Sequence, residues 1–142
     1  NLKKNSGVIF RNYKKKIDLK TVKKFNKLCK KNRLRFYLAN NIKLALQANL
    51  DGVYIPSFNK SLNLKILGSA HNILELKRKE QQGVDFIFLS PLFLTKNYQS
   101  NLGIIKFNLI TQETKKPVIA LGGIRKNNLN KINLINVVGL SG

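Results

Sequence analysis

The sequence predicts an α/β protein made of repeated strand–helix units, with its functional residues where the strands end. Apolar, β-branched runs at 84–90, 117–122 and 136–142 break into Ser, Pro or Gly, as buried parallel strands do at a loop. Segments of helical periodicity separate these runs, so the strands are joined by right-handed crossovers in a barrel or a doubly wound sheet. No Gly-rich dinucleotide fingerprint follows the first strand, which argues against a nucleotide-cofactor sheet.

The first half of the chain is expected to contain three strands and two helices. The strands are expected at 6–13, 33–39 and 50–56, and a polar loop at 58–63. A helix over 18–31 carries its apolar residues at helical spacing opposite a lysine-rich face. A second helix over 40–49 begins with Asn40, a residue type that caps helix N-termini well.

The second half of the chain is expected to alternate strands and helices more regularly. The strands are expected at 64–70, 84–90, 117–122 and 136–142, and the helices at 71–83, 102–116 and 124–135. Gly83 is expected to close the first of these helices. Ile105, Leu109 and Ile110 are expected to face inward from the second. The polar segment 91–101 has the character of a functional loop.

Seven strands are one short of a (β/α)8 TIM barrel, and 142 residues are below the usual length of about 200–250. We therefore expect one barrel domain over 1–142 that lacks the first βα unit and the closing helix. Such a barrel exposes strand edges, and we expect a homo-oligomer, another chain or a further segment to cover them.

Composition indicates a globular chain, since 43% of its residues are hydrophobic. No apolar run approaches the roughly 18 residues needed to span a membrane, and we expect no signal peptide. The lone cysteine, Cys29, is expected to be a small core residue. A single thiol without a secretion signal favours a cytoplasmic location.

The net charge of +21 admits three explanations. Clustered Lys and Arg can form a surface that binds nucleic acid. Alternatively, the abundance of Lys, Asn and Ile reflects A/T-rich codons, and the lysines are solvated helix faces. The third explanation is a positive field that collects small phosphorylated substrates.

The order of motifs DGVYIPS, GSAH, VDFIFLSPLFLT, LG, PVIALGGI and VVGLSG resembles the thiamine phosphate synthase family, which includes the TenI-type thiazole tautomerases. The resemblance runs from about residue 7 to 142. It implies a (β/α)8 barrel that joins a hydroxymethylpyrimidine diphosphate to a thiazole phosphate, with Mg²⁺, and releases pyrophosphate. It also implies phosphorylated small molecules as binding partners.

The resemblance carries over to named positions. Arg11 stands at a diphosphate-binding Arg, Ser69 at the Ser of the fifth-strand motif that His71 follows, and Thr95 at a Thr of the diphosphate loop. The thiazole-phosphate site falls on Gly122, Gly123, Leu140 and Ser141. Physical reasoning supports this last match, because loops after the last two barrel strands often bind phosphate and glycines let backbone N–H groups approach it.

Several positions depart from the family pattern. The two Mg²⁺-binding aspartates fall on Asn40 and Asn59, whose neutral amides should hold the cation less strongly. Two family lysines fall on Tyr13 and Tyr98, and a ring-binding Gln falls on Ile9. A tautomerase would carry His where this chain has Pro91.

Local explanations stand beside these assignments. Arg11 can be a surface charge, Ser69 a helix cap, and the two glycines a simple turn. Three functions remain open at this point. The first is thiamine phosphate synthase activity, the second is a degenerate family member that binds a phosphorylated ligand without turnover, and the third is nucleic-acid binding.

Overall fold

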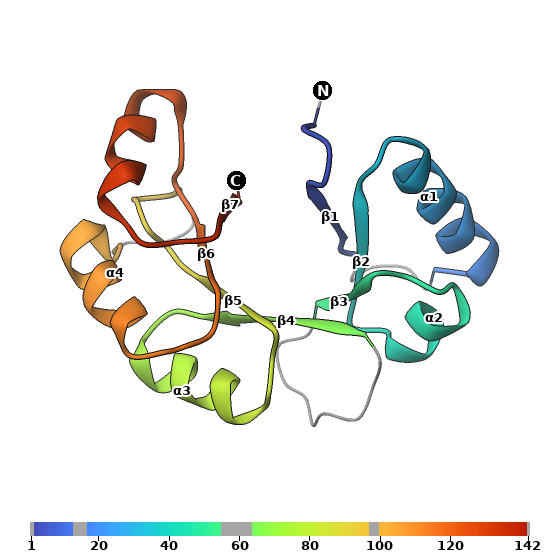
Figure 1. Cartoon of the computed structure of the whole chain (residues 1–142), viewed down its shortest axis with the longest axis horizontal. Helices are drawn as coiled ribbons and strands as arrows, with labels where there is room; N and C mark the ends of the chain where they lie inside the picture. Colours follow the sequence, from blue (N-terminus) through green and yellow to red (C-terminus); the bar gives the residue numbers. More distant parts are fainter. Residues whose placement is uncertain (1, 13–16, 55–63, 97–99, 142) are drawn as a thin grey trace. The chain divides into compact units, whose positions relative to one another are not determined.

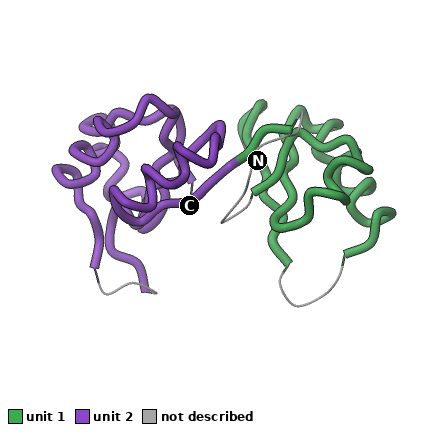
Figure 2. The backbone as a smooth tube through the Cα atoms, turned by 90° about the horizontal axis from the view of Figure 1, so that it is seen from below, with its two compact units in different colours: residues 1–56, 61–66 green, residues 57–60, 67–142 purple. Residues whose placement is uncertain are grey.

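A computed structural model describes residues 2–12, 17–54, 64–96 and 100–141 (Figure 1). The chain forms two compact units, residues 1–56 with 61–66 and residues 57–60 with 67–142 (Figure 2). We call them unit 1 and unit 2. The positions of Tyr13, Asn59 and Tyr98 and the expected loop at 58–63 lie outside the described residues.

Unit 1 contains three parallel strands in the order β1-β2-β3, with two helices between them in the sequence. The strands are β1 (Gly7–Phe10), β2 (Arg35–Ala39) and β3 (Gly52–Tyr54), and the helices are α1 (Leu19–Lys31) and α2 (Ile42–Gln47). Phe10 is in register with Leu38, and Ala39 with Tyr54. The predicted strands and helices of the first half are therefore present, each somewhat shorter than expected.

Helix α1 covers one face of this sheet. Phe25 of α1 lies 5.3 Å from the Phe10 ring and 6.4 Å from the Phe36 ring, measured between centroids. Cys29 is buried on the same helix, as predicted, whereas Leu28 is largely exposed. Since side chains alternate along a strand, Ile9 and Tyr37 lie on the face away from α1.

Unit 2 continues the same alternation. It contains β4 (Lys65–Ala70), whose first two residues belong to unit 1, followed by α3 (Ile73–Gln81), β5 (Phe86–Leu89), α4 (Gly103–Gln112), β6 (Val118–Leu121), the 3₁₀ helix η1 (Lys126–Leu134) and β7 (Gly139–Ser141). The strands are parallel in the order β4-β5-β6-β7. The predicted α/β repeat is confirmed in the described part of both units.

Helix α3 covers one face of the unit 2 sheet. A Cβ atom on Gly68 would lie 2.9 Å from the Lys79 side chain of α3, so Gly68 faces that helix. Ile87 and Val118 are in register with Gly68 and share this face, which is fully buried at Ile87. Ser69, the next residue along β4, therefore lies on the opposite face.

The N-terminal end of α2 differs from the prediction, whereas the end of α3 agrees with it. The N-cap of α2 is Asn41, whose side chain accepts from the Leu44 N–H at 3.0 Å, and not Asn40. Asn40 instead has a φ of 57°, a left-handed conformation that Asn tolerates better than most residues and that ends β2. Helix α3 ends at the C-cap Gln82, and Gly83 follows with a φ of 71°, the position where glycine commonly terminates a helix.

The prediction for the inward face of α4 was largely wrong. Ile110 is buried, but Ile105 is 79% exposed and Leu109 59% exposed. Phe107 and Thr111 are buried instead. Positions 107, 110 and 111 follow helical spacing, and the large Phe107 ring directs this face inward, which turns Ile105 and Leu109 outward.

Candidate functional site at the carboxyl ends of the strands

Arg11 lies at the carboxyl end of β1, immediately after Phe10. Its guanidinium carbon is 4.2 Å from the centroid of the Tyr54 ring, at the end of β3. Tyr54 is only 6% exposed, whereas Arg11 is exposed. Arg11 is therefore held in a cation–π contact and is not simply a free surface charge.

Asn40 follows the last residue of β2, between the strands that carry Arg11 and Tyr54. Its backbone N–H donates to the Tyr54 carbonyl oxygen at 3.0 Å. Its side chain is exposed. Unit 1 therefore brings two of the sequence-predicted residues, Arg11 and Asn40, to one edge of its sheet.

The donor chemistry around Asn40 does not fit a resident Mg²⁺ well. Asn40 supplies one neutral amide oxygen, and its predicted partner Asn59 lies outside the described residues. The carboxylates of unit 1 have other partners, since Asp18 accepts from the Thr21 N–H and Asp51 from the Phe36 N–H. Within the described ranges no group of three or more His, Cys, Asp or Glu residues could hold a metal ion.

In unit 2, His71 and Ser90 lie together where β4 and β5 end. The Nδ1 atom of His71 is 3.0 Å from the Ser90 carbonyl oxygen and 3.2 Å from its hydroxyl. Because a carbonyl oxygen only accepts, the shorter contact favours a proton on Nδ1. The Glu75 carboxylate accepts from the His71 backbone N–H at 2.9 Å and fixes this turn.

Ser69 does not cap the following helix. The N-cap of α3 is Asn72, which accepts from the Glu75 N–H at 2.9 Å. Ser69 is half-buried on the sheet face away from α3, in register with Phe88. The local capping explanation for Ser69 is therefore wrong.

Gly122 and Gly123 pack tightly against the loop that follows β5. Their φ angles are 96° and 69°, which favour glycine. A Cβ atom on Gly122 would lie 2.9 Å from Pro91, and one on Gly123 would lie 2.5 Å from the Phe93 carbonyl oxygen. The Phe93 N–H donates to the Gly122 carbonyl at 3.0 Å. Backbone conformation and close packing therefore account for glycine at both positions, independently of any ligand.

Thr95 lies further along the same loop. Its hydroxyl oxygen is buried and has no hydrogen-bond partner in the part of the chain that the structure describes. A buried hydroxyl without a partner costs about 1–3 kcal/mol, so such groups usually meet a water or a ligand. This unsatisfied hydroxyl supports a binding role for Thr95.

Leu140 and Ser141 of β7 lie on opposite faces of the sheet. Leu140 is in register with Ala120, and Ser141 with Leu121, the residue before Gly122. The register places Leu140 on the face that α3 covers and Ser141 on the face that carries Ser69. Leu140 can therefore meet a ligand on the Ser69 face only through its backbone.

A cavity of about 280 Å³ lies beside Gly123. Its lining comprises Phe93, Leu94, Gly123, Arg125, Asn127, Asn128 and Lys131. Two cations and no carboxylate line it, which suits an anionic group. Asn128 holds its wall in place, since its side chain accepts from the Arg125 N–H and donates to the Gly123 carbonyl, both at 2.8 Å.

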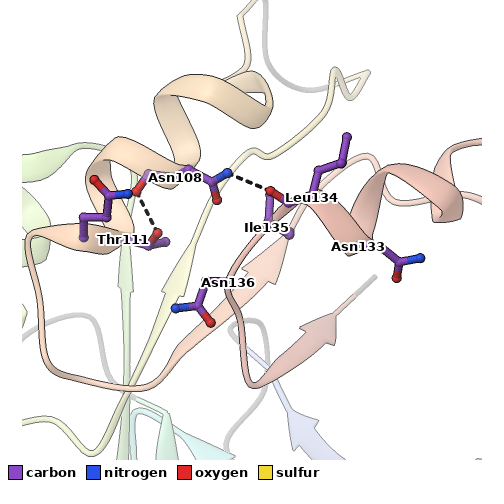
Figure 3. A pocket seen from close by; sticks show the side chains of 7 residues that line it. Asn108, Thr111, Asn133, Leu134, Ile135 and Asn136 are labelled. Atoms are coloured by element: carbon purple, nitrogen blue, oxygen red, sulfur yellow. Dashed lines mark hydrogen bonds between the residues drawn. The ribbon is translucent and has the colours of Figure 1, made fainter.

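A second cavity, of about 380 Å³, lies between α4 and the segment before β7 (Figure 3). The Asn108 side chain donates to the Leu134 carbonyl at 2.7 Å, and the Thr111 hydroxyl donates to the Asn108 carbonyl at 2.8 Å. This cavity lies near the amino end of β7, and none of the sequence-predicted residues lines it. The candidate site is therefore assigned to the carboxyl ends.

Three residues at the strand ends of the two units were not selected from the sequence. Tyr54 contacts Arg11, Ser90 contacts His71, and Asn128 bridges the turn after Gly123. Ser90 stands at the end of a predicted strand and Tyr54 near the end of another, so their positions were a usable signal. Nothing in the sequence indicated which residues Tyr54, Ser90 and Asn128 would contact.

A family model described as thiamine monophosphate synthase matches residues 5–142. The chain belongs to this family. The resemblance drawn from its motifs is confirmed, and so is the prediction of its α/β fold.

Individual relatives agree with this assignment. The chain is 35% identical over 125 residues to a thiamine-phosphate synthase of Prochlorococcus marinus subsp. pastoris, covering 80% of this chain and 36% of the relative. It is 30% identical over 135 residues to the Pelagibacter ubique thiamine-phosphate synthase, covering 84% and 64%. The chain thus spans about one third to two thirds of the length of these curated relatives.

Solved structures show the same fold. The thiamine phosphate pyrophosphorylase from Pyrococcus furiosus matches with a TM-score of 0.73 at 21% identity, over 96% of this chain and 70% of that chain. At this identity the likeness establishes the fold alone. Among the described helices, none has the length and apolar character needed to cross a membrane.

Proposed function

We propose that this protein is a thiamine phosphate synthase, which joins a hydroxymethylpyrimidine diphosphate to a thiazole phosphate and releases pyrophosphate. The family match over 5–142 carries this proposal. In the reaction the bond between the pyrimidine methylene carbon and the diphosphate oxygen breaks. The thiazole nitrogen then forms a bond to that carbon, and the diphosphate leaves with the electron pair.

Arg11 and Thr95 are the residues we assign to the diphosphate. Arg11 presents a fixed positive charge with several N–H donors, which suits the charge that develops on a departing diphosphate. The buried hydroxyl of Thr95 has no protein partner among the described residues and can donate to a phosphate oxygen. Ser69 is assigned to substrate contact from its place on the sheet face away from α3.

Gly122, Gly123 and Ser141 are assigned to the phosphate of the thiazole substrate, together with the backbone of Leu140. The cavity beside Gly123 supports this assignment, because Arg125 and Lys131 line it. Close packing of the glycine turn keeps its backbone in one conformation, so little reorganisation is needed when the anion binds.

Mg²⁺ in this family would neutralise diphosphate charge, and Asn40 and Asn59 would be its protein ligands. Because amides are weaker ligands than carboxylates for a hard cation, we place the charge stabilisation on Arg11 and not on a resident metal ion. A cytoplasmic location for this protein would agree with the small phosphorylated substrates of such a reaction.

The direct test is to mix the purified protein with both substrates and Mg²⁺ and to measure thiamine phosphate by oxidation to a fluorescent product. We expect product above the level of a double variant, Arg11→Ala with Thr95→Ala. If no product forms while thiazole phosphate still binds, the protein is a ligand-binding family member that lacks turnover. If neither substrate binds, the proposed function is wrong.

A further inference from the structure

We infer that Tyr54 is a positioning residue that holds Arg11 in place for the diphosphate of the substrate. This inference rests on the proposed function. It concerns a residue that touches Arg11 and acts through it. The contacts that support it all lie within unit 1.

The register of the sheet places the two residues in one row. Phe10 is paired with Leu38, so extending this register by one residue puts Arg11 beside Ala39. Ala39 is in turn paired with Tyr54. Residues paired across parallel strands point to the same face, and here that is the face away from α1.

The side chain at the centre of this row is small. Neighbouring strands lie about 4.8 Å apart, so the backbones that carry Arg11 and Tyr54 are separated by roughly 10 Å. The single methyl group of Ala39 leaves the intervening space open. Arg11 is long enough to cross it and brings its guanidinium carbon to 4.2 Å from the Tyr54 ring centroid.

The two side chains differ in how firmly the fold holds them, and this difference indicates which one orders the other. Tyr54 is 6% exposed, and its carbonyl oxygen accepts from the Asn40 N–H, so the ring is the fixed member. Arg11 is exposed. The ring therefore orders the arginine, and not the reverse.

A guanidinium over a ring face keeps its N–H donors at its edge, where they can bind a diphosphate bidentately. Without the ring, the Arg11 side chain would be ordered only when the substrate binds. The entropy lost in that ordering would then lower the affinity for the substrate. Tyr54 thus raises affinity for the diphosphate by fixing Arg11 beforehand.

Calorimetric titration of inorganic pyrophosphate into the full-length protein tests this directly. A cation–π contact of ordinary strength predicts that Tyr54→Leu weakens binding roughly three- to thirtyfold. Tyr54→Phe keeps the ring and should bind as tightly as the wild type. In the synthase assay, Tyr54→Leu should raise the KM for the pyrimidine diphosphate more than it lowers kcat.

Two further variants separate positioning from a loss of structure. Tyr37→Leu removes another buried aromatic side chain from the same sheet face and should leave pyrophosphate affinity unchanged. Arg11→Lys lies at an exposed position, keeps the charge and loses the planar group. It should weaken binding, and the effect of Tyr54→Leu should then largely vanish in the double variant.

The outcomes are distinguishable. If the wild type does not bind pyrophosphate, the diphosphate site of the proposed function falls together with this inference. If the wild type binds and Tyr54→Leu binds equally or more tightly, only the inference is overturned. A loss of affinity in Tyr54→Phe would also overturn it, because the hydroxyl and not the ring would then be responsible.

Discussion

The backbone of Gly123 lies so close to that of Phe93 that no side chain fits between them. A Cβ atom at position 123 would lie 2.6 Å from the Phe93 carbonyl carbon and 2.7 Å from the Leu94 carbonyl oxygen. The loop after β5, which carries Thr95, is thereby joined to the turn after β6, which borders the cationic cavity. Changes at Gly123 should therefore affect both parts of the unit 2 site.

Gly123→Ala should destabilise the protein by roughly 2–3 kcal/mol, since it combines a steric clash with backbone carbonyls and a left-handed φ. Urea denaturation measures the loss. Gly139→Ala is the matched control, because the nearest atoms to its Cβ would be 3.8 Å and 4.0 Å away on Ile119. We expect a change within about 0.5 kcal/mol there. Equal losses in both variants would contradict the close-approach explanation.

Thr95→Val should weaken pyrophosphate binding about tenfold or more, because it removes a hydroxyl assigned to a charged phosphate. The same change should leave the melting temperature unchanged or higher, since the lost hydroxyl has no described protein partner. Thr111→Val gives the opposite pattern, because the Thr111 hydroxyl donates to the Asn108 carbonyl. That variant should lose about 1 kcal/mol of stability and keep its affinity. A destabilised Thr95→Val with normal affinity would show that Thr95 is only structural.

Asn40→Asp together with Asn59→Asp should raise Mg²⁺ affinity at least about tenfold, because two carboxylates replace neutral amides. Asp tolerates the left-handed φ of position 40 nearly as well as Asn. Titration calorimetry with MgCl₂ measures the change. Asn41→Asp is the control, since it adds a neighbouring charge while preserving the N-cap of α2. No gain in the double variant would argue against a surviving metal position.

Lys79→Met should stabilise the protein at pH 7 by about 1 kcal/mol. Lys79 is 7% exposed on α3, and burial lowers its pKa below the ordinary value of 10.5, partly offset by the nearby Glu75. The charged form is thus disfavoured in the folded state at pH values below the folded pKa. This penalty disappears as the pH rises through the folded pKa towards 10.5.

The advantage of Lys79→Met over the wild type should therefore shrink as the pH rises from 7 through the folded pKa of Lys79 towards 10.5, as measured by urea midpoints. Lys20→Met, at an exposed position of α1, should show neither the gain nor the pH dependence. A constant advantage across this range would mean that Lys79 contributes through packing against Gly68 and not through its charge.

Local sequence patterns were enough to predict the alternation of strands and helices, because apolar periodicity depends on neighbouring residues. They were less reliable at helix ends and faces. Asn40 and Asn41 are equally good caps by residue type, and only the position at which β2 ends decides between them. On α4, Ile105 and Phe107 are both apolar, and packing against the sheet selects Phe107.

The motifs likewise indicated that Arg11, Thr95 and the Gly122–Gly123 turn stand at the ends of strands, since each follows an apolar run in the chain. The partners of these residues come from segments far away in the sequence. Tyr54 is 43 residues after Arg11, and Phe93 precedes Gly123 by 30. Such pairs depend on strand register and loop packing.

Sequence patterns were therefore enough to indicate the family, the α/β repeat and the positions from which functional side chains project. Those features follow from short-range periodicity and from residue types that stand in a particular order. Three-dimensional packing was needed to show that Tyr54 contacts Arg11, that Phe93 requires glycine at 123, and that the Thr95 hydroxyl is buried without a described partner. These relationships depend on distances of a few ångströms between strands and loops, which no linear pattern encodes.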